Sequence, residues 1–309
     1  MIRLDHREPI PGSLRGAVLA LGNFDGFHLG HQTVAAEAIG WAKSEGRPAI
    51  IATFAPHPMR FFKPDVAPFY LTTLDQRMEL FAAAGADAML VFHFDAALAG
   101  TPAERWIEDV IARHIGAAGV VTGEDFTFGQ RRGGNPELLR VLGAPLGVEA
   151  RTVAAVNDAG GPISSTRIRE ALRSGDCTEA ARLLTRPFAI RGTVQHGDKV
   201  GREIGFPTAN LDMGDYLRPR YGIYAITGRL PDGRIVAGAA NLGIRPSFDP
   251  PRELLEPYFF DFSGDLYGQE IDVALRHFLR AEAKFDSLEA LTAQMARDCD
   301  EARRLLAAI

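Results

Sequence analysis

The chain contains little cysteine. Only two of its 309 residues, Cys177 and Cys299, are cysteines, and they lie far apart in the sequence. Two distant cysteines cannot form the disulfide framework of a small secreted domain, nor a cysteine-rich zinc site. The fold must therefore depend on buried apolar residues. The hydrophobic share of 46% is typical of a soluble globular protein.

Positive charge is not in excess, since 34 Lys and Arg residues against 39 Asp and Glu residues give a net charge of −5. This balance argues against a constitutive nucleic-acid binder and offers no basic run for a membrane surface, although a locally basic phosphate pocket is compatible with it. No apolar run approaches the length of a transmembrane helix, and Met1–Pro11 lacks the apolar core of a signal peptide. We therefore expect a cytoplasmic protein without membrane or nucleic-acid partners.

Two common nucleotide-binding patterns are also missing around Gly22–His31, which reads Gly-Asn-Phe-Asp-Gly-Phe-His-Leu-Gly-His. Neither the Walker sequence nor Gly-x-Gly-x-x-Gly is present there. The stretch follows the apolar run Ala17–Leu21 and precedes Gln32–Ser44, which has the composition of a helix. A strand, a glycine-rich turn and a helix N-terminus direct backbone N–H groups at one point, which suits phosphate. His28 and His31 share a helix face and can donate hydrogen bonds to phosphoryl oxygens.

Two other interpretations of this stretch stay open. Each histidine could serve only to cap or pack the turn, or the pair could bind zinc with a third ligand such as His57. The glycine-rich strand–turn–helix setting favours phosphate chemistry over both.

The first part of the chain alternates strands and helices, which predicts an α/β domain with a parallel sheet and right-handed crossovers. The expected strands are Ala17–Leu21, Pro48–Phe54, Ala88–Phe92, Gly119–Thr122 and Val148–Val153. The expected helices are Gln32–Ser44, Leu74–Ala84, a helix from the capping box Thr101–Glu104 to about Ile115, Pro136–Leu142, one from Ser164 or Ser165 to Arg173, and Thr178–Leu184. Ligands of such sheets bind beyond the carboxyl ends of the strands, where the Gly22–His31 turn lies.

The pattern changes near Thr185, and we place a domain boundary there, between residues 1–184 and 185–309. Short strands broken by glycine and proline turns predict a small antiparallel barrel. The expected strands include Tyr221–Leu230, Ile235–Ala240, Phe259–Phe262 and Ile271–Phe278. Ser287 caps a closing helix, Leu288–Leu306, whose Leu288, Leu291 and Met295 are expected to pack on the barrel.

Further loops of the first domain carry candidate site residues. Two prolines stiffen the loop around His57, for which a structural role is the simplest interpretation. Phe62, Phe126 and Phe128 suit either the core or the face of a flat ring. The stretch 130–134, with two arginines, is either a phosphate-facing loop or a solvated one. Ile163–Arg169 places hydroxyl groups and Arg167 at a helix start, which suits a phosphate clamp but also an ordinary N-cap.

In the second domain, Thr208 and Asn210 lie one residue apart on one face of an extended segment. Their oxygens suit Mg²⁺, although from these residues alone stabilisation of a turn is the favoured interpretation. Glu256 is either a carboxylate that deprotonates a hydroxyl or a surface residue beside Glu253.

These stretches resemble a known family. Gly-Phe-His-Leu-Gly-His is similar to the His-x-Gly-His motif of the nucleotidyltransferase superfamily, and the longer string resembles the prokaryotic bifunctional FAD synthetases, which combine riboflavin kinase and FMN adenylyltransferase. Four further stretches resemble motifs of that family and occur in the family's order. They are Ile-Ser-Ser-Thr-Arg-Ile-Arg, Gly-Arg-Glu-Ile-Gly-Phe-Pro-Thr-Ala-Asn, Asn-Leu-Gly-Ile-Arg-Pro-Ser-Phe and Glu-Pro-Tyr-Phe-Phe-Asp-Phe. The resemblance runs from about Leu19 to Ala302.

The resemblance implies a nucleotidyltransferase-like domain at 1–184 and a riboflavin kinase domain at 185–309, with ATP, riboflavin and FMN as substrates and Mg²⁺ as cofactor. It implies catalytic roles for His28, His31, Arg167 and Glu256. It implies adenylyltransferase ATP contacts from Gly22, Asn23, Phe24, Asp25, His57, Ser164, Ser165 and Thr166. It implies flavin contacts from Phe62, Asp125 and Phe128. It implies kinase ATP contacts from Gly201, Arg202, Gly205 and Pro207, and magnesium ligation by Thr208 and Asn210.

The chain departs from the family pattern at three positions: Ser247 stands for Thr, Pro257 for Val and Tyr258 for His. Pro257 and Tyr258 lead us to expect a local distortion of their strand. Two rival interpretations are an aminoacyl-tRNA synthetase fragment, for which a tRNA-binding module is missing, and a flavin-binding protein that has lost one activity. Self-association is left open.

Overall fold

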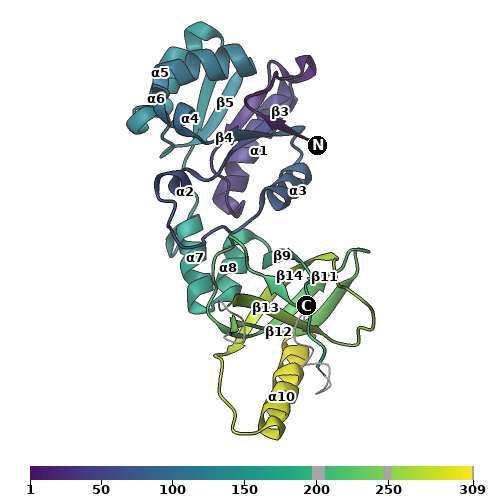
Figure 1. Cartoon of the computed structure of the whole chain (residues 1–309). Helices are drawn as coiled ribbons and strands as arrows, with labels where there is room; N and C mark the ends of the chain where they lie inside the picture. Colours follow the sequence, from purple (N-terminus) through teal and green to yellow (C-terminus); the bar gives the residue numbers. More distant parts are fainter. Residues whose placement is uncertain (197–205, 246–251, 308–309) are drawn as a thin grey trace. The chain divides into compact units, whose positions relative to one another are not determined.

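The computed structural model describes residues 1–196, 206–245 and 252–307 (Figure 1). The chain forms two compact units, one made of Met1–Ala67 with Leu74–Ser164, the other of Pro68–Thr73 with Ser165–Ile309. Pro68–Thr73 thus belongs with the second unit although it lies within the sequence of the first. The predicted boundary near Leu184 stays a prediction about where the chain can be divided into domains.

The first unit is built on a parallel sheet of six strands in the order β1-β4-β3-β2-β5-β6. In chain order these strands are β1 (Ile2–Asp5), β2 (Val18–Leu21), β3 (Ala49–Ala55), β4 (Ala88–His93), β5 (Gly119–Gly123) and β6 (Glu149–Val153). The predicted α/β class is confirmed. The edge strand β1 was not predicted, because it is only four residues long and its alternation of apolar and charged residues is too brief to stand out in a charged segment.

Helices join the strands of the first unit. They are η1 (Gly12–Leu14), α1 (Leu29–Ser44), α2 (Pro58–Phe62), α3 (Leu74–Ala84), α4 (Ala96–Gly100), α5 (Ala103–Arg105), η2 (Trp106–Ile115), η3 (Gln130–Arg132), α6 (Pro136–Gly143) and η4 (Ala144–Leu146), followed by a small hairpin of β7 (Asn157–Asp158) and β8 (Gly161–Pro162). The capping box expected at Thr101 is wrong: its hydroxyl donates to the carbonyl of Ala97 at 2.8 Å. The helix that follows also differs, because η2 has π-type hydrogen bonding.

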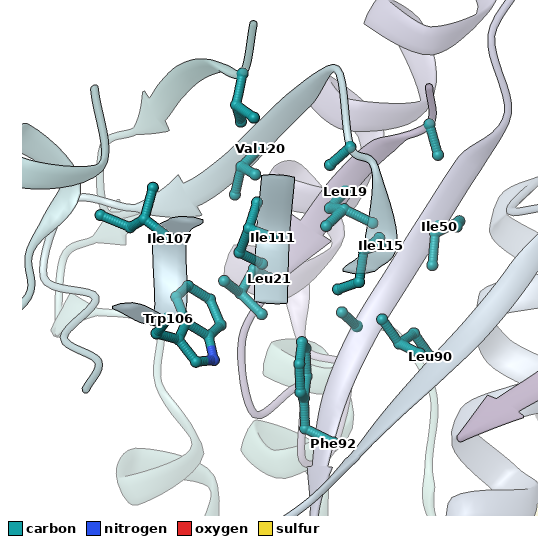
Figure 2. Close-up of a cluster of buried hydrophobic side chains, with 14 of the residues drawn as sticks. Leu19, Leu21, Ile50, Leu90, Phe92, Trp106, Ile107, Ile111, Ile115 and Val120 are labelled. Atoms are coloured by element: carbon teal, nitrogen blue, oxygen red, sulfur yellow. The ribbon is translucent and has the colours of Figure 1, made fainter. Parts of the chain in front are cut away.

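The two faces of the sheet bury different side chains. On one face, Leu19 and Leu21 pack with Trp106 and Ile111 of η2, as Figure 2 shows. On the other face, Val18 and Ala20 pack against α1. Because alternate residues of β2 are buried on opposite faces, the strand is apolar throughout and lies at the centre of the sheet.

The second unit contains a nearly closed antiparallel barrel in the order β10-β13-β12-β11-β14-β9. Its elements in chain order are α7 (Ser165–Ser174), α8 (Cys177–Leu184), β9 (Phe188–Thr193), β10 (Leu211–Asp212), β11 (Gly222–Arg229), β12 (Ile235–Arg245), β13 (Arg252–Phe259), β14 (Glu270–Arg280) and α10 (Leu288–Leu306). The backbone N–H of Gln195 donates to the carbonyl of Asn210 at 2.8 Å and links β9 to β10. The predicted barrel is confirmed.

Two predictions within the barrel are wrong in detail. The strand expected at Phe259–Phe262 is instead β13, which ends at Phe259. Helix α10 packs on the barrel through Cys299, Ala302 and Leu306, which continue the predicted stripe at the same spacing. Leu291 and Met295 of that stripe are half-buried, whereas Leu288 at its start is 53% exposed. Arg280 of β14 also holds the last turns of α10, with Nη2 at 2.7 Å from Asp298 Oδ2.

None of the helices within 1–196, 206–245 and 252–307 is long and apolar enough to cross a membrane.

Candidate functional site

The turn after β2 lies at the point where the strand order of the sheet reverses. Strand β2 pairs with β3 on one side and with β5 on the other. Because the chain runs from β2 to β3 on one side and from β5 to β6 on the other, the carboxyl ends of β2 and β5 flank a crevice of the kind in which α/β proteins bind ligands. Residues 22–28 form this turn and lead directly into α1.

The two histidines of the turn lie against each other. The rings of His28 and His31 stack with centroids 3.6 Å apart and an angle of 20° between their planes. His28 is the N-cap of α1, and its Nδ1 accepts the backbone N–H of His31 at 3.4 Å. In the neutral ring of His28 the proton therefore sits on Nε2, which makes that atom a donor. A Cβ on Gly30 would lie 3.2 Å from His28 Cε1, so this close approach uses a glycine.

A buried ion pair lies beneath the turn. Arg77 Nη2 is 3.4 Å from Asp25 Oδ1, and each side chain is only 2% exposed. Arg77 also donates to the hydroxyl of Thr53 at 3.2 Å, and that hydroxyl donates to the carbonyl of Asn23 at 2.6 Å. These contacts hold the backbone of Asn23 and the side chain of Asp25, two predicted ATP-binding residues. Arg77 was not predicted from the sequence, because its partners lie 24 and 52 residues away along the chain.

Asn23 and Phe24 use their side chains differently. The Oδ1 atom of Asn23 is buried and has no hydrogen-bond partner among the described residues, a state that is unusual away from functional sites. The ring of Phe24 is 1% exposed and packs edge-on against His31 at 5.2 Å. Phe24 therefore supports the His31 ring, and Gly22 leaves room for it, since a Cβ there would lie 3.2 Å from the Phe24 ring.

Two further loops follow the neighbouring strands β3 and β5. After β3, His57 is the N-cap of α2, and its Nδ1 accepts the N–H of Met59 at 3.1 Å. Phe62 ends α2 with 64% of its surface exposed, and its ring lies edge-on to Phe94 at 5.7 Å. Such an exposed ring is available to stack on a flat ligand.

The phenylalanine expected after β5 lies in the core. Phe128 is 6% exposed, and its ring packs on Trp106 at 4.8 Å between centroids. A Cβ on Gly134 would lie 2.4 Å from this ring. The burial of Phe128 thus favours packing over the flavin contact that we expected, whereas Asp125 is exposed.

The predicted phosphate clamp begins where α7 begins. Ser164 ends the first compact unit, and Ser165, Thr166 and Arg167 form the first turn of α7 in the second. Arg167 Nη2 donates to Glu179 Oε1 of α8 at 2.6 Å. A phosphate role for Arg167 therefore stays a prediction. It requires the guanidinium either to leave Glu179 for the phosphate or to bind both groups at once.

In the barrel, the predicted base and magnesium ligands lie on adjacent segments. Glu256 of β13 stands directly opposite Asn241 of β12. The backbone N–H of Ala209, between Thr208 and Asn210, donates to the carbonyl of Pro257 at 2.9 Å. Asn210 is 8% exposed and Thr208 is half-buried. Pro207 is described too, while Gly201, Arg202, Gly205 and Ser247 lie outside the described residues.

The distortion expected from Pro257 and Tyr258 is absent, since β12 and β13 pair without a register shift from Gly238 to Arg245. The reason is that the N–H missing from Pro257 would face the Ala209 segment and not β12. An antiparallel residue directs its N–H and C=O to the same neighbour, and the Pro257 carbonyl bonds Ala209. No bond to β12 is lost. Tyr258 packs edge-on against Phe206 at 5.4 Å, next to the Thr208 segment.

Within the described part of the chain, no three His, Cys, Asp or Glu side chains gather as a metal-binding group. The zinc interpretation of His28 and His31 thus lacks a third ligand among those residues. A magnesium site is a different case, because Mg²⁺ is held by few protein oxygens and keeps waters and phosphate oxygens as its other ligands. The hydroxyl of Thr208 and the amide oxygen of Asn210 fit that donor chemistry.

Comparisons with known proteins agree on both units. A family model described as FAD synthetase matches residues 10–167, and one described as riboflavin kinase matches residues 184–306. The bifunctional riboflavin kinase/FMN adenylyltransferase of Escherichia coli K12 is 38% identical over 92% of this chain and 90% of its own. That of Haemophilus influenzae is 37% identical over 94% of each. A crystal structure from Streptococcus pneumoniae, described as a macrolide-efflux protein, covers 98% of this chain and 99% of its own with a TM-score of 0.87 and 29% identity.

Proposed function

The chain belongs to the family of bifunctional riboflavin kinase/FMN adenylyltransferases, and from this premise we propose how its two units divide the work. The enzyme phosphorylates riboflavin to FMN and then transfers AMP to FMN to give FAD. The observation that carries this function is the match of two consecutive family models to nearly the whole chain. The description as a macrolide-efflux protein applies to the streptococcal protein and is not carried over to this chain.

The first unit supports adenylyl transfer. In this step the FMN phosphate attacks the α-phosphorus of ATP, a new P–O bond forms, and pyrophosphate leaves with the electron pair of the broken bond. Because the attacking phosphate is already ionised, the site needs donors and positioning more than a strong base. The stacked His28 and His31 at the N-terminus of α1 can supply donors there. Ser164 and Arg167 are proposed to hold the phosphates, with Ser165 and Thr166 beside them.

The second unit supports phosphorylation. Here Glu256 accepts the proton of the riboflavin 5′-hydroxyl as its oxygen attacks the γ-phosphorus of ATP, and ADP leaves. Thr208 and Asn210 would hold Mg²⁺, which neutralises charge on the ATP phosphates when bound. Pro207 and the glycine and arginine residues at 201–205 are proposed to line the ATP site.

Small-molecule partners fit the composition. The family supports ATP, riboflavin and FMN as partners, the net charge of −5 argues against nucleic acid, and the scarcity of cysteine supports a cytoplasmic location.

The division of labour is tested by following riboflavin, FMN and FAD chromatographically with ATP and Mg²⁺ present. Wild type should make both products. We predict that His31→Ala accumulates FMN, because the adenylyl step loses a donor worth roughly 10²–10³ in rate. Glu256→Gln should make FAD from supplied FMN but hardly any from riboflavin, because an amide cannot take the proton.

Glu270→Gln is the matched control for Glu256→Gln, since Glu270 lies on strand β14 of the same barrel with its side chain 62% exposed. It should retain both steps. If His31→Ala and Glu256→Gln each suppress both steps equally, the assignment of one activity to each unit is wrong.

A further inference from the structure

An asparagine amide lies between two carboxylates next to the proposed kinase base. Asn241 Nδ2 is 3.5 Å from Glu256 Oε2 and 3.2 Å from Glu282 Oε1. Asn241 and Glu256 are directly paired across β12 and β13, and residues opposite each other on antiparallel strands project from the same face. The contact is therefore built into the register of the barrel.

Chemistry fixes the orientation of this amide. Turning it over would place Oδ1 against two carboxylate oxygens, so only the N–H groups can face Glu256 and Glu282. The Oδ1 atom is then buried, and it has no hydrogen-bond partner in the described part of the chain. A buried acceptor without a partner costs stability. Stability alone thus does not explain an asparagine at this position, whereas its donor groups have a clear use.

The strand also makes room for the second carboxylate. A Cβ on Gly243 would lie 2.1 Å from Glu282 Oε1, so only a glycine allows Glu282 to lie over β12 at this point. Glu282 belongs to the segment that follows β14. Two residues of β12 therefore position the Glu282 side chain: Asn241 donates to it, and Gly243 leaves space for it.

We propose that Asn241 is a positioning residue for the riboflavin kinase step. Its amide, anchored on Glu282, holds the Glu256 carboxylate in the rotamer that receives the proton of the attacking hydroxyl. A neutral amide suits this task, because it orients a carboxylate without cancelling the negative charge that a proton acceptor needs. The inference rests on the proposed kinase role of Glu256.

The test begins with Asn241→Asp, which keeps the side-chain shape and replaces the donor with an acceptor, and with Asn241→Ala. Each should lower the kinase kcat by about 10- to 100-fold, because the carboxylate loses its alignment. The KM values for riboflavin and ATP should stay near wild type, as should FMN adenylylation. Gln269→Glu is the control: this barrel amide donates to the backbone of Asp265 at 2.8 Å, and its conversion should leave the kinase kcat unchanged.

A conservative variant separates positioning from folding. Asn241→Gln keeps the amide and its N–H donors on a side chain one methylene longer. Its amide can still donate to Glu256 and Glu282, so the kinase kcat of Asn241→Gln should stay closer to wild type than that of Asn241→Asp or Asn241→Ala. Wild-type FMN formation tests the proposed function by itself. If wild type makes FMN but Asn241→Asp has an unchanged kcat or raises only KM, or if Asn241→Gln is as slow as Asn241→Asp, the positioning role is wrong.

Discussion

Gly30 shows how much of the adenylyltransferase site depends on one missing methyl group. A Cβ at this position would lie 3.2 Å from both His28 Cε1 and the carbonyl oxygen of Ile163. If a side chain is added, the ring or the backbone must shift by a few tenths of an ångström. Glycine at position 30 therefore favours the stacked geometry of His28 and His31.

We predict that Gly30→Ala slows FMN adenylylation about 10- to 100-fold, because the His28 ring is displaced from the turn. Riboflavin phosphorylation should not change. Gly40→Ala is the matched control in the same helix, since nothing lies within 4 Å of its added Cβ, and it should retain full activity and gain stability. Steady-state rates with FMN as substrate measure the effect. Equal rates for both variants would contradict a constrained His28.

At this scale the sequence predicted residues that lie in motifs and missed those that act across strands. The histidine pair and Glu256 are recognisable because glycine spacing and family motifs surround them. Arg77 reads as a surface residue of a helix, yet it is buried on Asp25. A role for Asn241 can be inferred only from the strand register, which places Glu256 opposite it. Phe128 shows the converse, because nothing in the sequence reveals that Trp106 covers its ring.

Among the elements, three strands of the barrel share one charged contact. Asp272 of β14 lies opposite Arg191 of β9 and Arg229 of β11. Arg191 donates two hydrogen bonds to the carboxylate, from Nε to Oδ1 at 2.7 Å and from Nη2 to Oδ2 at 3.0 Å. Arg229 donates from Nε to Oδ2 at 3.0 Å. Burial raises the pKa of the Asp272 carboxyl, but the two guanidinium groups outweigh it and leave the pKa below its ordinary value.

A lowered pKa in the folded state means that the charged carboxylate stabilises the fold above the unfolded pKa of about 4, and that this stability is lost as pH falls through the folded pKa. We predict that Asp272→Asn destabilises the second unit by about 3 kcal/mol at pH 7, because it leaves Arg191 without its buried partner. The difference from wild type should shrink below about pH 4. Urea unfolding at several pH values measures it.

Asp300→Asn is the control, since Asp300 is 80% exposed beside Arg303 and should change stability little at any pH. A difference between Asp272→Asn and wild type that stays constant down to pH 2 would contradict the ionised pair.

Element types were easier to predict from sequence than element details. Alternating apolar segments and glycine punctuation were enough for the parallel sheet and the barrel. The capping box at Thr101 failed because the hydroxyl bonds the preceding short helix α4. The predicted face of α10 was right but its extent was not, because the contacts with the barrel lie in its later turns, where Arg280 also pairs with Asp298, and Leu288 at its start is exposed. Neither effect is visible in local periodicity.

For the whole molecule, the question is where the kinase unit begins. The buried Leu183 and Leu184 of α8 precede the predicted boundary, and Arg220 donates its backbone N–H to the carbonyl of Leu172 in α7 at 3.0 Å. A fragment that starts at residue 185 loses these contacts, whereas a fragment that starts at residue 165 keeps them.

We predict that fragments 165–309 and 185–309 both make FMN and no FAD, and that the longer one melts more than about 5 °C higher, because the shorter one exposes the apolar surface that α8 covers. Thermal unfolding by circular dichroism and the product assay measure this. Equal melting temperatures would place the boundary at residue 184 after all.

The segment Pro68–Thr73 gives the molecule an order of assembly. Tyr70 exchanges backbone hydrogen bonds with the 215–217 stretch, donating to Asp215 at 3.1 Å and accepting from Leu217 at 2.8 Å. A ribosome releases Tyr70 long before it releases these partners. The nascent chain can thus complete the sheet of the first unit while Pro68–Thr73 still lacks the 215–217 stretch with which Tyr70 pairs. The first unit can therefore finish during translation, whereas the second cannot be complete until a segment made early pairs with one made much later.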